Sequence, residues 1–154
     1  MKPAQGQPRT SVFLDIPLIL ERLYYRYPSL LVDAVVEHEP GRRLVAVKNV
    51  TVNEEYFQGH FPGTPLMPAV VMIESLVQVS TLLLLGQDSV KPTISAVLRG
   101  VDNAKFRRQV VPGDRLTIEA TVQSRQSKAA VMRGVARLAE QTVAEADLII
   151  DLVD

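Results

Sequence analysis

Residues 58–78 read QGHFPGTPLMPAVVMIESLVQ, and residues 69–85 extend the second half of this stretch to AVVMIESLVQVSTLLLL. The extended part is apolar at nearly every position, which is typical of a helix buried around most of its circumference. Gly86 follows directly, and glycine is the residue most often found just after a helix. We therefore expect a helix over Ala69–Leu85 that other elements must enclose.

Three of the polar residues in this apolar helix lie on one face. Glu74, Gln78 and Thr81 are spaced at i, i+4 and i+7, so they share one face of the helix. We expect a sheet to cover the rest of the helix and the polar groups to emerge along this seam.

The remaining sequence is mainly typical of β-strands. Asp15 and Pro17 predict the start of a short helix over residues 16–23. Apolar and β-branched runs between turn signals predict strands at residues 30–37, 43–52, 93–98, 104–110, 114–124, 129–138 and 142–152. The fold class is therefore α+β, with a curved antiparallel sheet wrapped around one long hydrophobic helix, which is the hotdog fold. Such a sheet leaves an edge strand with which a second subunit can pair.

The composition is that of one globular domain. The chain has 154 residues, of which 47% are hydrophobic and 22% are charged, and its formal net charge is zero. We expect a single domain over residues 13–154, after a disordered segment over residues 1–12. A formal net charge of zero gives no indication of nucleic-acid binding. We also expect no membrane insertion and a cytoplasmic location, because no apolar run is long enough to span a bilayer and no secretory signal is found.

The sequence gives no indication of a metal or a cofactor. It contains no cysteine and only two histidines, which lie far apart, and this disfavours both disulfides and a metal site. Phosphate-loop, dinucleotide and nucleophile-elbow motifs are also absent from the sequence. One of the histidines, His38, lies in the charged segment EHEPG and is expected to be solvated.

His60 and Glu74 are the candidates for acid–base chemistry. His60 lies in a loop over residues 53–68 that glycines and prolines stiffen, and imidazole titrates near neutral pH. Glu74 has apolar neighbours on the helix, and apolar surroundings favour the protonated form of a carboxylate, which suits a general acid. Each residue alone also fits a structural role, as a surface histidine or as an ion-paired glutamate. Backbone amides at the helix start, near Ala69, could polarise a substrate carbonyl.

Lys105, Arg107 and Arg108 form a small basic cluster, with Arg99 nearby. The cluster fits either a solvated strand edge or a docking surface for an acidic partner.

Three segments together resemble a known family. They are YRYPSLLVD, then AVKNVTVNEEYFQGHFPGTPLMPAVVMIESLVQ, then GVDNAKFRRQVVPGD. They resemble the (3R)-hydroxyacyl-[acyl carrier protein] dehydratases of FabZ type, which have the hotdog fold and act in fatty acid biosynthesis. The motif GHFPGxPxMP, followed by a helix glutamate, is the most specific part. The likeness covers the chain from about Leu23 to its last strand.

This resemblance implies a cofactor-free elimination of water from a 3-hydroxyacyl thioester, giving the trans-2-enoyl product. His60 matches the catalytic histidine and would take the C2 proton. Glu74 matches the catalytic carboxylate and would help the C3 hydroxyl to leave, directly or through a water. Amides near Gly63 and Ala69 would bind the thioester carbonyl, and Gln78 would support Glu74.

The resemblance also implies the partners. His60 and Glu74 would come from opposite subunits of a homodimer, and the dimers would assemble as a trimer of dimers. Lys105, Arg107 and Arg108 would meet the acidic surface of acyl carrier protein, which carries the substrate.

The sequence departs from the family pattern at four positions. Tyr25 replaces the histidine of the family motif PHRYPF, and Ser29 replaces its phenylalanine. Ala69 replaces the glycine of the motif MPGV, and Arg99 replaces a small residue. The added methyl of Ala69 narrows the space beside the carbonyl, and an Arg99 that points into the acyl tunnel would change the preferred chain length. Two alternatives stay open: a hotdog acyl thioesterase in which Glu74 activates water, and a non-catalytic hotdog partner subunit.

Overall fold

The computed structural model of the chain describes residues 12–86 and 94–153. Its elements are α1 (Ile16–Arg22), β1 (Ala34–Glu39), β2 (Arg43–Asn49), the 3-10 helix η1 (Glu55–Phe57), α2 (Ala69–Leu85), β3 (Ser95–Phe106), β4 (Arg115–Gln126), β5 (Ala129–Leu138) and β6 (Gln141–Val153). Residues 1–11, which belong to the segment expected to be disordered, lie outside the described residues.

Both expected helices are confirmed. Pro68 precedes α2, and Gly86, with a φ of 69°, ends it in a backbone conformation that glycine adopts at little steric cost. At the start of α1, the Asp15 side chain accepts a hydrogen bond from the amide of Leu18. The starts and ends of both helices therefore follow from residues next to them in the sequence.

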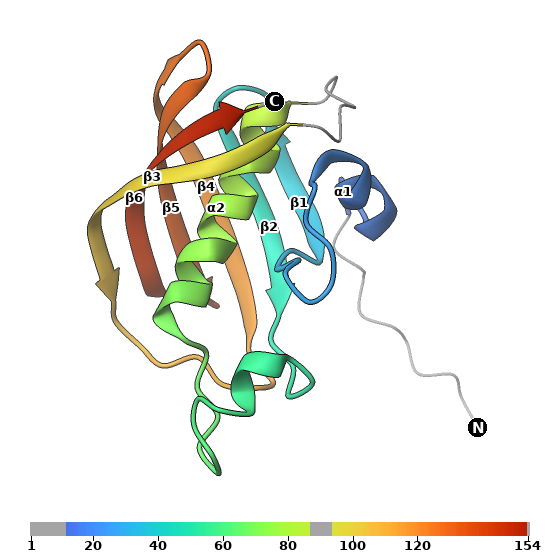
Figure 1. Ribbon diagram of the computed structural model, residues 1–154, viewed down its shortest axis with the longest axis vertical. Coiled ribbons are helices and arrows are strands. Elements are labelled where there is room, and N and C mark those ends of the chain that lie inside the picture. Colours follow the sequence, from blue (N-terminus) through green and yellow to red (C-terminus); the bar gives the residue numbers. More distant parts are fainter. Residues whose placement is uncertain (1–11, 87–93, 154) are drawn as a thin grey trace.

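The strands form one antiparallel sheet in the order β1-β2-β4-β5-β6-β3. Figure 1 shows α2 running across one face of this curved sheet, with α1 beside β1. α2 contacts β2, β3, β4, β5 and β6, so the sheet curves around it. The expected α+β class and the wrapped-helix arrangement are confirmed.

The sheet and α2 approach each other closely at β5. A Cβ atom at Gly134 would lie 3.0 Å from the Cβ of Leu76, which is tighter than most real side-chain contacts. The missing side chain therefore lets the helix lie directly on the sheet. Leu76 belongs to the same buried core as other large, fully buried side chains, among them Leu44, Leu82, Leu116, Ile118, Met132, Leu148 and Ile150.

Several predicted strands are wrong in their bounds. The runs predicted at 93–98 and 104–110 contribute residues 95–98 and 104–106 to a single strand, β3, which ends at Phe106, and residue 93 lies outside the described residues. Gly100, Asp102 and Asn103 look like strand breakers in the sequence, but the pairing of β3 with β6 absorbs them in two register irregularities. Asn103 has a φ of 53° at the second of these. The first predicted strand, at 30–37, also begins later, at Ala34.

The polar seam of α2 is enclosed at Gln78 and Thr81 and stays partly open only at Glu74, which corrects that expectation in part. Gln78 is 0% exposed and Thr81 is also buried. The Oε1 atom of Gln78 accepts a hydrogen bond of 2.8 Å from the Leu31 amide, and its Nε2 donates one of 2.7 Å to the Ser29 carbonyl. The segment between α1 and β1 therefore covers the seam, because its backbone satisfies the buried amide.

His38 is not a fully solvated turn residue either. It lies on β1, where its ring packs edge-on against Phe13 with centroids 5.2 Å apart. Burial, together with the nearby Arg22, lowers the pKa of His38 below its ordinary value. No helix among the described residues is long and apolar enough to cross a membrane.

Candidate active site

The loop that carries His60 is held by its own backbone. Phe61 and Thr64 exchange two hydrogen bonds of 2.9 Å, and the amide of Leu66 donates to the carbonyl of His60 at 2.9 Å. Gly63 has a φ of 75° in this turn, a conformation that side-chain-bearing residues rarely adopt. The rings of His60 and Phe61 stack with centroids 4.0 Å apart. The loop therefore presents the imidazole in one orientation.

One hydrogen bond assigns the roles of the two ring nitrogens of His60. Its Nδ1 lies 2.7 Å from the carbonyl oxygen of Leu66. A carbonyl oxygen can only accept, so Nδ1 must carry the proton of this bond. In the neutral ring, Nε2 then has a free lone pair and can act as a base. His60 is half-buried and lines a pocket.

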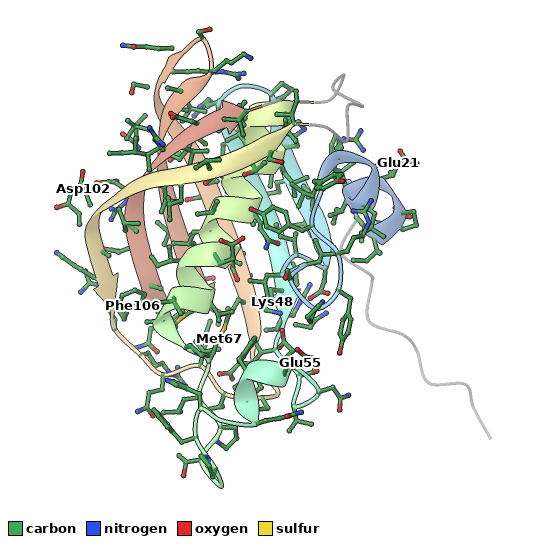
Figure 2. All side chains as sticks on the ribbon, viewed as in Figure 1. Glu21, Lys48, Glu55, Met67, Asp102 and Phe106 are labelled. Atoms are coloured by element: carbon green, nitrogen blue, oxygen red, sulfur yellow. The ribbon has the colours of Figure 1, made fainter. Side chains whose placement is uncertain are left out.

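A pocket of about 290 Å³ surrounds His60 at the start of α2. The amide of Met67 donates to the carbonyl of Val110 at 2.8 Å, and this bond brings the residues after β3 against the loop. Figure 2 shows Met67 and Phe106 at the same end of the molecule. The pocket is lined by His60, Leu66, Met67, Ala69, Met72, Phe106, Arg107, Arg108 and Gln109.

The N-terminus of α2 opens toward this pocket. The amides of Val71 and Met72 bond to the carbonyl of Pro68, and in the part of the chain that the structure describes no side chain caps this helix end. Ala69 is exposed and lines the His60 pocket, so the first residue of the helix lies beside that pocket. Gly63 is exposed in the turn and does not line the pocket of a single chain.

Glu74 lies in a different pocket, of about 430 Å³. Its carboxylate is half-buried, and the Nε2 atom of Gln78 donates to Glu74 Oε1 at 3.0 Å. Because Gln78 is fixed by Ser29 and Leu31, it holds one oxygen of Glu74 in place. The pocket is lined by Tyr25, Pro28, Ser29, Leu31, Tyr56, Val70, Val71 and Glu74.

Tyr25 is a site residue whose role sequence reasoning missed. Its side chain lines the same pocket as Glu74, close enough for the two groups to interact electrostatically. Burial, and next the charge and hydrogen bond of Glu74, raise the pKa of Tyr25 to about 12. The only signal in the sequence was that position 25 departs from the family pattern.

In the part of the chain that the structure describes, His60 and Glu74 line different pockets. His60 bonds to the Leu66 carbonyl, whereas Glu74 accepts a bond from Gln78 and shares its pocket with Tyr25. One chain therefore presents the two candidate residues at separate places.

The basic residues are partly engaged in ion pairs. Arg107 lies 3.0 Å from Glu145, which Arg133 also approaches at 3.2 Å, and Arg108 donates to Gln141 at 2.8 Å. The Arg107 hydrogen bond is the largest cause of the lowered pKa of Glu145. Arg107 and Arg108 line the His60 pocket, whereas Lys105 is exposed beyond it.

Arg99 lies outside both the His60 pocket and the Glu74 pocket. Its Nε lies 3.2 Å from Asp151 on β6, and its side chain is largely exposed. Within residues 12–86 and 94–153, no group of three or more histidine, aspartate and glutamate side chains gathers as metal ligands would.

Comparison with known proteins identifies the family. Residues 23–147 match the FabA-like domain. The chain is 50% identical over 144 residues to the 3-hydroxyacyl-[acyl-carrier-protein] dehydratase FabZ of Anaeromyxobacter dehalogenans, with 92% of each chain covered. The chain belongs to the FabZ dehydratase family. The FabZ enzyme of Enterococcus faecalis is 48% identical over 135 residues, which cover 88% of this chain and 95% of that protein.

Solved structures agree on the FabZ-family fold. The dehydratase heterocomplex ApeI:P from Xenorhabdus doucetiae superposes with a TM-score of 0.72 at 14% identity, covering 88% of this chain and 91% of that chain. PH1136 from Pyrococcus horikoshii gives a TM-score of 0.63 at 16% identity, covering 87% and 92%. At such low identity these structures support the hotdog fold alone.

Proposed function

We propose that the protein eliminates water from a (3R)-hydroxyacyl chain carried as a thioester on acyl carrier protein, giving the trans-2-enoyl thioester. The observation that carries this proposal is 50% identity to a FabZ dehydratase over 92% of both chains. It makes the protein a hydro-lyase of fatty acid biosynthesis. The His60 pocket and the Glu74 pocket contain the base and the acid that such an elimination needs.

His60 is the proposed base. Its Nε2 takes the C2 proton, and the electron pair of the C2–H bond forms the C2=C3 double bond while the C3–O bond breaks. The Leu66 carbonyl, 2.7 Å from Nδ1, stabilises the imidazolium that forms. The Ala69 amide at the uncapped start of α2 binds the thioester carbonyl and stabilises negative charge on its oxygen. Gly63 stays a predicted carbonyl-binding residue.

Glu74 is the proposed acid. It delivers a proton to the departing C3 hydroxyl, directly or through a water, so that the oxygen leaves as water. Gln78 holds its Oε1 atom, which leaves the other oxygen for this transfer. A pair of groups with opposite roles lets the same site remove one proton and donate another.

We infer that the complete site forms in a homodimer. β3 is one of the two edge strands of the sheet, and edge strands expose unpaired backbone groups that a second chain can bond. Its exposed apolar side chains include Val97, Leu98, Val101 and Phe106. Because Phe106 also lines the His60 pocket, a copy paired along β3 would lie next to that pocket. A trimer of such dimers, and a cytoplasmic location, stay predictions.

A direct assay tests the proposal. The purified protein is incubated with 3-hydroxyacyl carrier-protein thioesters of short, medium and long chain length, and products are followed by mass spectrometry. We expect the acyl chain to lose about 18 mass units. This is the mass of one water, so it identifies the reaction as a dehydration. We expect at least a ~100-fold fall in turnover for both His60→Ala and Glu74→Gln. Full turnover in both variants would contradict the mechanism.

The same assay separates the two alternatives. Release of free carrier-protein thiol from a saturated acyl thioester would indicate a thioesterase. An inactive protein that gains activity only when mixed with a second hotdog chain would indicate a non-catalytic subunit.

A further inference from the structure

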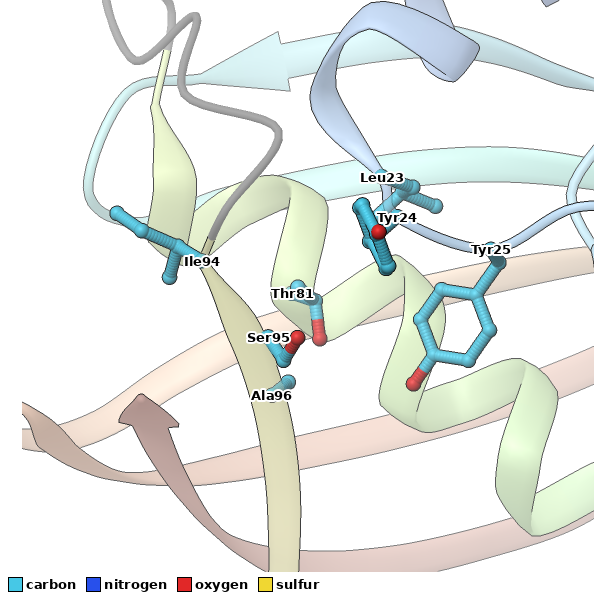
Figure 3. A pocket seen from close by; sticks show the side chains of 7 residues that line it. All are labelled: Leu23, Tyr24, Tyr25, Thr81, Ile94, Ser95 and Ala96. Atoms are coloured by element: carbon cyan, nitrogen blue, oxygen red, sulfur yellow. The ribbon is translucent and has the colours of Figure 1, made fainter. Parts of the chain in front are cut away.

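Glu74 is approached by polar side chains from two different elements. Gln78 lies one turn further along α2 and donates to Oε1 at 3.0 Å. Tyr25 comes from the segment between α1 and β1 and lines the same pocket as Glu74. Figure 3 shows the Tyr25 ring reaching toward α2 with its hydroxyl directed at the helix. The carboxylate is therefore held from its own helix and from a separate segment.

The segment that carries Tyr25 is itself fixed. The guanidinium of Arg26 donates to the carbonyls of Leu23 and Tyr25 at 2.8 Å each, and to that of Leu20 at 3.1 Å. Further along, Gln78 bonds to the backbone of Ser29, so the segment is anchored on both sides of Tyr25. A donor on an anchored backbone orients its acceptor at a smaller entropic cost than a donor on a mobile loop.

The state of the Tyr25 hydroxyl is also defined. Burial and the neighbouring Glu74 raise the pKa of Tyr25 to about 12, so the phenol keeps its proton throughout the neutral range. A protonated phenol can donate a hydrogen bond to a carboxylate oxygen that lies in the same pocket. Tyr25 is therefore available to Glu74 as a neutral donor.

Tyr25 contributes to two cavities. One is the Glu74 pocket, and the other has a volume of about 200 Å³. Figure 3 shows this second cavity, which is lined by Leu23, Tyr24, Tyr25, Thr81, Ile94, Ser95 and Ala96. Tyr25 lines both, so its ring limits the space into which the Glu74 side chain can turn.

We propose that Tyr25 is a positioning residue for the dehydration. Its hydroxyl and its ring hold the Glu74 carboxylate in the orientation that serves the C3 hydroxyl of the substrate. Tyr25 acts through Glu74 and does not itself touch the reacting atoms. This inference rests on the proposed dehydratase function.

The test compares two changes at position 25 with a matched change at position 24. Tyr25→Phe removes the hydroxyl and keeps the ring. Replacing Tyr25 with 4-aminophenylalanine, introduced by stop-codon suppression, restores an N–H donor at the same place. Tyr24→Phe is the control, because Tyr24 lines the same second cavity but is 66% exposed.

We expect Tyr25→Phe to lower kcat about tenfold with KM changed less than about twofold, because the donor that orients the Glu74 carboxyl group is lost while substrate contacts stay. The 4-aminophenylalanine variant should recover kcat to within about threefold of the wild type, and Tyr24→Phe should match the wild type. The melting temperature of each variant is measured alongside.

Each other outcome overturns a different claim. A Tyr25→Phe variant with wild-type kcat would overturn the positioning role. A loss of kcat that the 4-aminophenylalanine variant fails to recover, with a lowered melting temperature in both, would assign Tyr25 a purely structural role. A wild-type protein without dehydratase activity would overturn the proposed function itself.

Discussion

The Nδ1 atom of His60 and the carbonyl oxygen of Leu66 lie 2.7 Å apart, and the amide of Leu66 returns a bond of 2.9 Å to the carbonyl of His60. These two bonds close a short ring within the loop. They fix the imidazole and also its protonation pattern, since the carbonyl accepts only from a protonated Nδ1. The same side chain therefore stabilises the loop with one nitrogen and is available for chemistry with the other.

Two amide variants can separate these two roles of His60. Asparagine can place an N–H near the position of Nδ1, so His60→Asn should keep the Leu66 bond and the melting temperature while kcat falls at least ~100-fold. His60→Gln reaches further and leaves the Leu66 carbonyl without its donor, so it should lose activity and also about 1 kcal/mol of stability. Steady-state kinetics and thermal unfolding check both. Substantial turnover in His60→Asn would contradict the role of Nε2 as the base.

The separation of His60 and Glu74 into two pockets predicts complementation between inactive variants. In a mixed dimer of His60→Asn and Glu74→Gln chains, one of the two composite sites would contain both native residues. Random mixing should therefore restore about a quarter of the wild-type activity, because about half of the dimers are mixed and each has one intact site. The variants are co-expressed with different tags, and the mixed species is isolated and assayed. No activity in the isolated mixed dimer would mean that each site is built from one chain.

Local sequence signals account for α2 and fail for β3. The apolar run of α2 is delimited by Pro68 and Gly86, which are neighbours in the sequence, so its bounds could be predicted. β3 contains Gly100 and Asn103, which are breakers by local preference. They are tolerated because β6 supplies the pairing on either side of each irregularity, and this long-range pairing is not encoded in local periodicity.

The candidate active site could likewise be predicted only where the sequence carries a local signal. The motif around His60 and the apolar setting of Glu74 singled out both residues as candidates. The contact of Tyr25 with Glu74 could not be predicted, because it depends on how the segment after α1 folds over α2. The buried Gln78 determines that path, and its two bonds to the segment are tertiary contacts.

A buried ion pair beneath the His60 loop predicts a stability effect. Lys48 on β2 is 3% exposed, and its Nζ lies 2.5 Å from Glu54, just before η1. Figure 2 shows Lys48 close to this end of the sheet. Lys48→Met would leave the half-buried Glu54 carboxylate without its cation and should lower the free energy of unfolding by about 2–4 kcal/mol. Urea denaturation followed by circular dichroism measures this change.

The double variant Lys48→Met with Glu54→Gln provides the control for that ion pair. It removes both charges, so it should be more stable than Lys48→Met alone. The amide of Thr51 donates to Glu54 at 3.0 Å, and glutamine can still accept this bond. If the double variant is as unstable as the single one, the loss comes from packing and not from an unpaired charge.

The exposed basic residues near the His60 pocket predict a defect that depends on the carrier protein. We expect Lys105→Glu combined with Arg108→Glu to raise KM for a carrier-protein substrate about tenfold, because both residues would face the acidic partner. KM for the same acyl chain on a pantetheine thioester should change little, since that substrate lacks the acidic surface. Arg42→Glu is the matched control, because its side chain is 80% exposed on the β1–β2 turn, away from the pocket. Raising the salt concentration should reduce the difference between the double variant and the wild type. An equal rise in KM on both substrates would place these residues at acyl binding and not at carrier-protein docking.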